Sequence, residues 1–156
     1  MKNRVGVVFR PGTSADAKAI WTIYITSRKQ FLPYAPLAHS DSDILEYMTA
    51  QLIPNCQLIV AVLDEIIVGM MALSRDEAAG WIEQLYLHPQ LVGQGIGSQL
   101  VGQAKAQIGS PLRLYTFQAN EGARRFYERH GFKAIAFGDG SGNEEKCPDV
   151  LYEWRL

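Results

Sequence analysis

Residues 81–98 read WIEQLYLHPQLVGQGIGS and join an apolar extended segment to a helical pattern through a glycine-rich turn. The first seven residues predict a strand with alternating faces, one carrying Trp81, Glu83, Leu85 and Leu87 and the other Ile82, Gln84 and Tyr86. After Pro89 come Gly93, Gly95 and Gly97, and then apolar residues at helical spacing, namely Ile96, Leu100, Val101, Ala104 and Ile108. Unshielded backbone N–H groups at the positive end of a helix dipole attract phosphate, and a Cβ in the turn would hold an anion away. The junction therefore predicts an anion-binding bend.

Two common nucleotide-binding loops do not fit this turn. A P-loop ends in Gly-Lys-Ser/Thr, whereas Gly95 is followed by Ile96, Gly97 and Ser98, so the lysine is missing. A dinucleotide fingerprint would require an acidic residue at the end of the next strand, and residues 115–117 contain none. A tight strand-to-helix connection without a ligand remains an alternative on this turn alone.

The bulk properties indicate one compact domain over residues 1–156. A formal net charge of −1 gives no reason to expect nucleic acid or an anionic membrane as a partner. No apolar run reaches the about 20 residues of a transmembrane helix, and residues 1–12 have too short an apolar core for a signal peptide. We therefore expect a cytoplasmic protein.

Cysteines and histidines are scattered along the chain. Cys56 and Cys147 lack a C-x-x-C partner, which predicts two reduced thiols instead of a disulfide. His39, His88 and His130 do not share metal-ligand spacing, so no metal site is predicted.

The first half of the chain predicts a strand, two helices and a hairpin. Residues 4–10 read as a strand, and Thr13 or Ser14 caps a helix whose buried face is formed by Ala19, Ile20, Ile23, Tyr24, Ser27 and Phe31. Residues 34–39 are either a surface loop or part of a substrate rim. A second helix begins within residues 40–43 and ends at residues 54–55. Residues 57–63 and 66–73 predict a β-hairpin because two polar residues separate two apolar runs.

The second half predicts a right-handed crossover followed by two more strands. Residues 112–117 should lie parallel to residues 81–87, because a helix of about a dozen residues joins them. Asn120 suits the cap of the next helix, Gly131 suits its end, and residues 132–137 and 150–156 predict the last strands. The fold class is α/β with a mixed sheet.

Two motifs resemble those of the GNAT superfamily of N-acetyltransferases. The bend resembles its cofactor loop, R/Q-x-x-G-x-G/A, with Gly95 and Gly97 as the two glycines and with Val92 as a departure at the R/Q position. Residues 120–132, NEGARRFYERHGF, match its second signature, N-x-x-A-x-x-F-Y-x-x-x-G-F, without departure. The resemblance implies a sheet of about seven strands with four helices, whose two central parallel strands splay apart to admit the pantetheine arm of acetyl-CoA.

The same resemblance implies roles for individual residues. Tyr127 corresponds to the general acid. Glu83, placed among apolar residues, is expected to be a buried carboxylate that either has a partner or has its pKa raised toward the range useful to a base, so it is either a general base acting through water or a structural group. The residues implied in holding coenzyme A form three groups: Leu85, Tyr86 and Leu87; Val92, Gly93, Gln94, Gly95, Ile96, Gly97 and Ser98; and Asn120, Ala123, Arg124, Phe126 and Tyr127. Arg124, Arg125 and Arg129 either form a solvated face or, at Arg124, meet the cofactor's phosphates.

The implied function is transfer of an acetyl group from acetyl-CoA directly to a primary amine of a small molecule, peptide or protein. The alternative is a non-catalytic acyl-CoA-binding sensor or regulatory module, in which Tyr127 would have no purpose. Residues 30–43 and 138–149 are expected to choose the acceptor, and an acidic rim at Glu144, Glu145 and Asp149 would steer a cationic amine. A monomer and a homodimer both fit the sequence.

Overall fold

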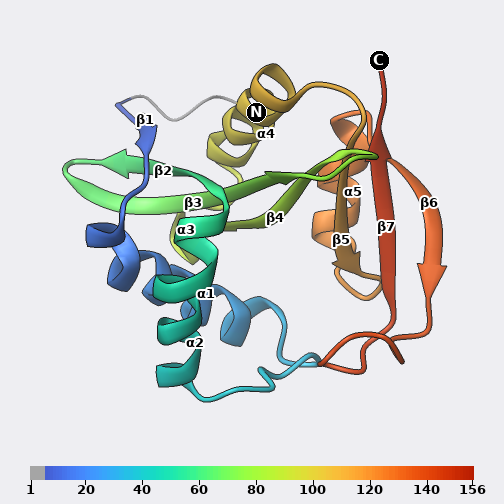
Figure 1. Cartoon of the computed structure of the whole chain (residues 1–156), viewed down its shortest axis with the longest axis horizontal. Coiled ribbons are helices and arrows are strands. Elements are labelled where there is room, and N and C mark those ends of the chain that lie inside the picture. Colours follow the sequence, from blue (N-terminus) through green and yellow to red (C-terminus); the bar gives the residue numbers. More distant parts are fainter. Residues whose placement is uncertain (1–5) are drawn as a thin grey trace.

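The computed structural model describes residues 6–156, which form one mixed sheet with helices on both of its faces (Figure 1). In chain order the elements are β1 (Val8–Pro11), α1 (Ala17–Phe31), α2 (Asp41–Tyr47), α3 (Ile53–Asn55), β2 (Gln57–Leu63), β3 (Ile66–Arg75), β4 (Gly80–Leu87), α4 (Ile96–Ile108), β5 (Leu112–Phe117), α5 (Glu121–Arg129), β6 (Lys133–Gly138) and β7 (Asp149–Trp154). A π-helical turn, Met48–Leu52, joins α2 to α3 without a break. The described residues therefore contain four continuous helical segments, as predicted.

The sheet has seven strands in the order β1-β2-β3-β4-β5-β7-β6 within the described part of the chain. All neighbours are antiparallel except β4 and β5, which are parallel because α4 crosses between them. This arrangement confirms the predicted hairpin, crossover and mixed sheet.

Local sequence signals account for most of the turns and helix ends. Asp64 and Glu65 both have positive φ, 51° and 66°, which is the conformation of a two-residue hairpin loop. The Ser40 hydroxyl accepts a hydrogen bond from the backbone N–H of Asp43 at the start of α2. Gly131, with φ of 87°, follows the end of α5.

Two predicted details differ in the structure. The first strand was predicted over residues 4–10, whereas β1 spans Val8–Pro11, and residues 4 and 5 lie outside the described residues. Phe31, predicted on the buried face of the first helix, is exposed because it is the last residue of α1. Cys56 and Cys147 are both free, as predicted.

The core consists of two apolar clusters separated by the sheet. One lies under α4 and α5 and includes Leu100, Val101, Leu114 and Tyr127. The other lies under α1 and α2 and includes Ile20, Ile44, Val60 and Met70. No helix in residues 6–156 is both long and apolar enough to span a bilayer. Both central strands, β4 and β5, contribute to the cluster under α4 and α5, so a gap between them is flanked by core on that face.

Candidate functional site

The parallel strands β4 and β5 stay together for only two residue pairs. Gly80 pairs with Leu112 and Trp81 with Arg113, and beyond that point the two strands diverge (Figure 1). The remaining residues of β4 pair with β3 alone in the described sheet, so their polar backbone groups on the β5 side lack a strand partner. This geometry confirms the splayed pair predicted from the sequence.

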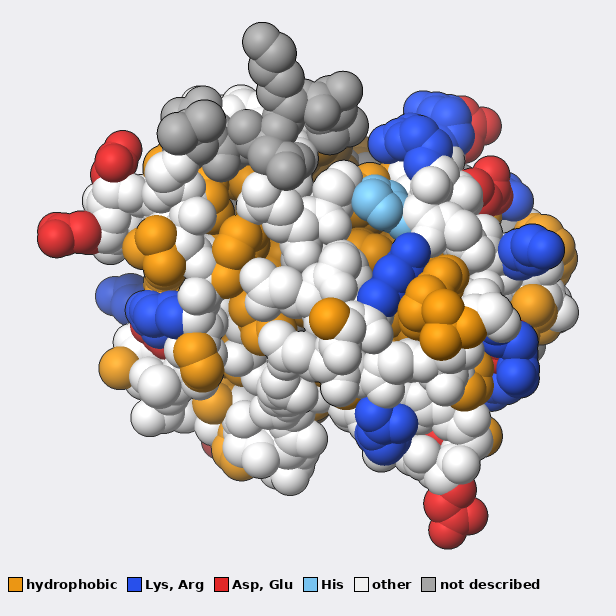
Figure 2. Space-filling model, turned by 90° about the horizontal axis from the view of Figure 1, so that it is seen from above, with side chains coloured by type: hydrophobic (Ala, Val, Ile, Leu, Met, Phe, Trp, Pro, Cys, Tyr) orange, Lys and Arg blue, Asp and Glu red, His pale blue; other side chains and the backbone are white. Residues whose placement is uncertain are grey.

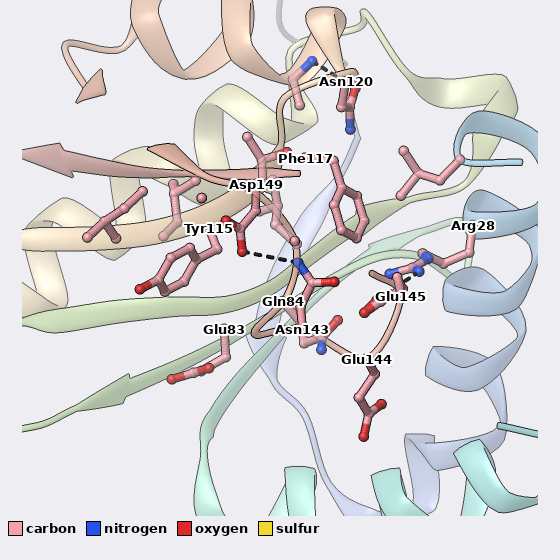
Figure 3. A pocket seen from close by; sticks show the side chains of 18 of the residues that line it. Arg28, Glu83, Gln84, Tyr115, Phe117, Asn120, Asn143, Glu144, Glu145 and Asp149 are labelled. Atoms are coloured by element: carbon pink, nitrogen blue, oxygen red, sulfur yellow. Dashed lines mark hydrogen bonds and ion pairs between the residues drawn. The ribbon is translucent and has the colours of Figure 1, made fainter. Parts of the chain in front are cut away.

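The divergence opens into a cavity of about 1120 Å³. Its walls are residues 82–86 of β4, residues 114–117 of β5, parts of α1, α2 and α5, and the segment 136–145. Figure 3 shows Glu83 and Tyr115 on one side of this cavity and Arg28 with Glu145 on the other. Of the predicted site residues, Glu83, Leu85, Tyr86, Asn120, Ala123 and Tyr127 line it.

A β-bulge at Glu83 changes the faces of β4. Ala72 pairs with Gln84 and Leu73 pairs with Ile82, so Glu83 is the extra residue. Ile82 therefore shares the face of Leu85 and packs into the cluster under α4 and α5. The strict alternation predicted from the sequence, with Ile82 opposite Leu85, is wrong at this point because a bulge shifts the period by one residue.

The predicted burial of Glu83 is also wrong. Its side chain is exposed at the bulge, where Oε1 accepts a hydrogen bond from Ser74 Oγ at 2.6 Å. A bulge turns the extra residue out of the regular pleat, so Glu83 reaches the cavity wall without being enclosed by apolar neighbours.

The glycine bend follows β4 and contains two residues in the left-handed region. Gly93 and Gly95 have φ of 84° and 88°, a conformation that is unfavourable for residues with a Cβ. Gly95 is the N-cap of α4 and offers no side-chain cap, so the first amides of this 13-residue helix lack an internal acceptor. Gly97 is needed for packing, because a Cβ there would meet the Phe126 ring at 3.2 Å.

These features fit the diphosphate of coenzyme A. The bend presents backbone N–H groups at the positive end of α4, directly after the strand that borders the cavity. Val92 stands at the position where the resemblance implies Arg or Gln, and its side chain is 52% exposed. Because this side chain is apolar, it adds no hydrogen bond to an anion. The bend residues lie beyond the end of β4 and outside the cavity wall.

Tyr127 is held by the helix that follows β5. The Asn120 side chain caps α5 by accepting a hydrogen bond from the Ala123 N–H at 3.2 Å, as predicted. The Tyr127 ring lies edge-on to Phe126 and Phe132, with centroid separations of 5.1 and 5.6 Å. Burial, with a smaller contribution from Tyr86, raises the pKa of the Tyr127 phenol well above its ordinary value. The phenol is therefore neutral at physiological pH.

The arginines of α5 are not among the residues that line the cavity. Arg124 Nε donates to the Tyr152 hydroxyl at 3.0 Å, and Nη1 donates to the Gln118 carbonyl at 3.4 Å. Arg125 lies 3.9 Å from Glu121, and Arg129 stacks over Phe126. Figure 2 shows cationic side chains mostly on the right-hand side of one face, interspersed with apolar and acidic groups instead of forming a continuous basic surface. Arg124 thus has protein partners already.

Many of the cavity residues were not identified from the sequence, among them Arg28, Tyr24 and Gln84. Arg28 and Tyr24 reach the cavity from α1, and Gln84 reaches it from β4, where its Oε1 is buried without a hydrogen-bond partner among the described residues. The only signal in the sequence was the spacing of four between Tyr24 and Arg28, which places both on one helix face. Arg28 is a cation on an otherwise apolar helix face, and this contrast is the signal by which it could have been identified.

Comparison with known proteins gives consistent results. Residues 54–134 match the family described as "Acetyltransferase (GNAT) domain". The peptidyl-lysine N-acetyltransferase YjaB of Salmonella typhimurium is 32% identical over 116 residues, which cover 74% of this chain and 73% of that protein.

Two solved structures share the fold. The solution structure of apo-form YjaB from Escherichia coli has a TM-score of 0.76 and 21% identity, covering 95% of this chain and 97% of that chain. The crystal structure of the PaiA N-acetyltransferase from Thermoplasma acidophilum, in complex with coenzyme A, has a TM-score of 0.78 and 18% identity, covering 96% and 99%.

Proposed function

The chain belongs to the GNAT acetyltransferase family, and from this we propose that it transfers an acetyl group from acetyl-CoA to a primary amine. The transfer is direct, within a ternary complex of enzyme, acetyl-CoA and amine. The observation that carries the proposal is the gap between β4 and β5, which has Tyr127 in its wall and the uncapped start of α4 beyond its end. A small molecule, a peptide or a protein could each present the amine.

Three parts of the chain would hold acetyl-CoA. The amides of the bend at residues 93–98 suit its diphosphate, and the backbone of β4 near Leu85 suits the amides of its pantetheine arm. Asn120 lines the cavity beside them. When bound, acetyl-CoA supplies an acetyl thioester, which an amine attacks directly.

Tyr127 acts as the general acid. Its buried phenol keeps its proton at neutral pH, because burial raises its pKa, and the departing thiolate takes this proton as the thioester bond breaks. Tyr127 therefore protonates the departing sulfur, and the side chain needs no other partner for this step.

Glu83 acts as the general base through a water molecule. Its exposed carboxylate lies on the cavity wall and is oriented by the Ser74 hydroxyl. An acceptor amine is protonated at neutral pH and must lose a proton before attack. The exposure of Glu83 leaves room for a water between the carboxylate and the amine.

The acceptor is proposed from the described activity of one relative and from the charges of the cavity. The relative from Salmonella typhimurium is described as acting on peptidyl lysine, so lysine-containing peptides are the first acceptors to test. Asp43, Glu144 and Asp149 line the cavity and would attract an ammonium group.

The decisive test is Tyr127→Phe in an assay of thiol release from acetyl-CoA with a panel of amines. Turnover should fall by roughly ten- to thousandfold, because proton delivery to the sulfur is lost, while coenzyme A affinity stays nearly unchanged. Tyr152→Phe is the matched control, since this phenol packs 6.4 Å from the Tyr127 ring and lies outside the cavity wall. An unaltered rate in Tyr127→Phe would remove the phenol from the mechanism. Tight coenzyme A binding without thiol release on any amine would favour the binding module.

A further inference from the structure

Arg28 is a buried cation on the wall of the cavity. Its side chain is 6% exposed, although it is an ionised guanidinium near the end of α1. Removing such a charge from water is costly unless counter-charges and hydrogen bonds replace the lost hydration. The groups that compensate the buried charge of Arg28 therefore indicate what this side chain does in the protein.

The partners come from four other segments. Nη2 donates to the Ala35 carbonyl at 3.1 Å and to Glu145 Oε2 at 3.3 Å. The guanidinium also lies 5.5 Å from the centroid of the Phe117 ring and interacts with the Tyr86 hydroxyl. One side chain thus connects α1, the α1–α2 connection, β4, the end of β5 and the β6–β7 connection.

Glu145 links the β6–β7 connection to the Arg28 side chain. The connection, residues 139–148, contributes several side chains to the cavity wall, and Figure 1 shows it beside the α1–α2 connection. A second contact between the two connections, His39 Nε2 to Glu144 Oε2 at 3.0 Å, is exposed and stabilises little. The Glu145 side chain is only 19% exposed, so the pair with Arg28 is the stronger tie.

The Arg28–Glu145 ion pair also determines the net charge that the cavity wall presents to an acceptor. Arg28 is the only Lys or Arg on the cavity wall among the described residues, and Glu145 neutralises it. The other carboxylates on the wall, such as Asp43 and Asp149, have no Lys or Arg partner there. The ion pair consequently ties the guanidinium to the protein's own loop through Nη2, while Nε is buried without a hydrogen-bond partner among the described residues.

From these contacts we propose that Arg28 is a positioning residue for the acceptor. Through Glu145 it holds residues 139–148 against α1, and through Tyr86 it fixes the adjoining part of β4, so the width of the acceptor end of the cavity depends on it. The proposal rests on the proposed acetyltransferase function, because it assigns this end of the cavity to the amine.

The test compares Arg28→Met, Glu145→Gln and the double variant. Each single change should raise the acceptor KM by on the order of tenfold or more, because a binding wall displaced by about 1 Å no longer fits its ligand. In Glu145→Gln the affinity for coenzyme A should change less than about twofold, since Glu145 bonds to Arg28 and not to the bend or the backbone of β4 that are proposed to hold coenzyme A. The double variant should be no worse than Arg28→Met alone, as expected for two partners in one interaction.

The control is Lys29→Met, which breaks an exposed ion pair of 3.1 Å on the next residue of α1 and outside the cavity wall. Amide hydrogen exchange of residues 139–148 gives a readout independent of activity. It should become faster in Glu145→Gln and stay unchanged in this control. If Arg28→Met does not fold, Glu145→Gln carries the test alone.

Two results would overturn the proposal: wild-type exchange of residues 139–148 in Glu145→Gln, or an acceptor KM that rises equally in the Lys29→Met control. Failure of the proposed function would look different. In that case the wild-type protein would bind coenzyme A but acetylate no amine. The exchange rates of residues 139–148 in wild type and Glu145→Gln would still show whether Glu145 restrains the β6–β7 connection.

Discussion

At the level of single residues, the cavity wall combines a buried phenol, a buried guanidinium and an exposed carboxylate. Tyr127 and Arg28 are enclosed by core side chains, whereas Glu83 stands at the bulge of β4. Burial favours the neutral form of a phenol, and it requires a partner for a guanidinium. Tyr127 and Arg28 are therefore in the protonation states that an acid and a fixed cation require.

Replacing Glu83 by Gln tests its role as the base. We expect kcat/KM for the amine to fall roughly ten- to hundredfold at pH 7, since a general base typically contributes at least this much. The defect should shrink as the pH rises toward the pKa of the amine itself, because a deprotonated amine needs no base. The measurement is kcat/KM against pH for wild type and variant.

Ser74→Ala serves as the comparison for this series. It removes the 2.6 Å hydrogen bond to Glu83 but keeps the carboxylate, so its effect should be much smaller. A Glu83→Gln profile that runs parallel to wild type at all pH values would contradict the assignment.

At the level of elements, the β4–bend–α4 unit brings a strand edge and a helix start together. The bend depends on left-handed backbone at Gly93 and Gly95, and α4 packs beneath it through Leu100 and Val101, which are fully buried. A helix anchored in this way keeps its first amides in a fixed position, which is what an anion site requires.

Two glycines near this junction should respond oppositely to alanine. Gly95→Ala places a Cβ on a residue with φ of 88°, which should cost about 1–2 kcal/mol and weaken coenzyme A binding by disturbing the bend. Gly102→Ala, in the exposed middle of α4 where a Cβ meets nothing within 4 Å, should stabilise the fold by about 0.5–1 kcal/mol and leave binding unchanged.

Urea unfolding and calorimetric titration with coenzyme A separate these effects. Equal coenzyme A affinity in Gly95→Ala and wild type would show that the bend does not bind the diphosphate. A destabilised Gly102→Ala would mean that this part of α4 is strained.

At the level of the whole molecule, the cluster under α4 and α5 packs against both diverging strands, whereas the cluster under α1 and α2 packs against β4 alone of the two. In Figure 1 the β3–β4 pair runs from the left across the middle of the sheet, and the β5–β7–β6 group stands on the right. Only two residue pairs join the two groups directly, so packing against the helices maintains the gap.

Buried tyrosines around this gap predict a loss of stability at alkaline pH. Burial raises the pKa of Tyr24 to about 12, and it also raises the pKa of Tyr86 and Tyr127. Since the folded-state values exceed the unfolded value near 10, the stabilising effect is complete below about pH 10 and is lost as the pH rises above it.

Each phenol that ionises only on unfolding should lower the free energy of unfolding by about 1.4 kcal/mol per pH unit above that point. The measurement is urea unfolding between pH 8 and the alkaline limit, with tyrosinate absorbance as the second probe. Tyr24→Phe should reduce the slope, and a free energy of unfolding that is constant through this range would contradict the prediction.

The order of elements, the hairpin, the caps of α2 and α5, the glycine bend and the family could all be predicted from the sequence. Each depends on residues that are close in the chain: the pair Asp64–Glu65, the cap Asn120 with Ala123, or the spacing of Gly93 and Gly95. Local backbone preferences and side-chain periodicity are properties of such short stretches, so they are readable without the fold.

Only the tertiary structure decided the bulge at Glu83 and the burial of Arg28. The bulge is a mismatch between the register of β3 and that of β4, and nothing within β4 alone reveals it. Arg28 meets Glu145 across 117 residues of chain, and the cost of burying its charge is met by groups that only folding brings together. Pairing register and long-range charge compensation are set by the assembled sheet, which is why local sequence patterns did not predict them.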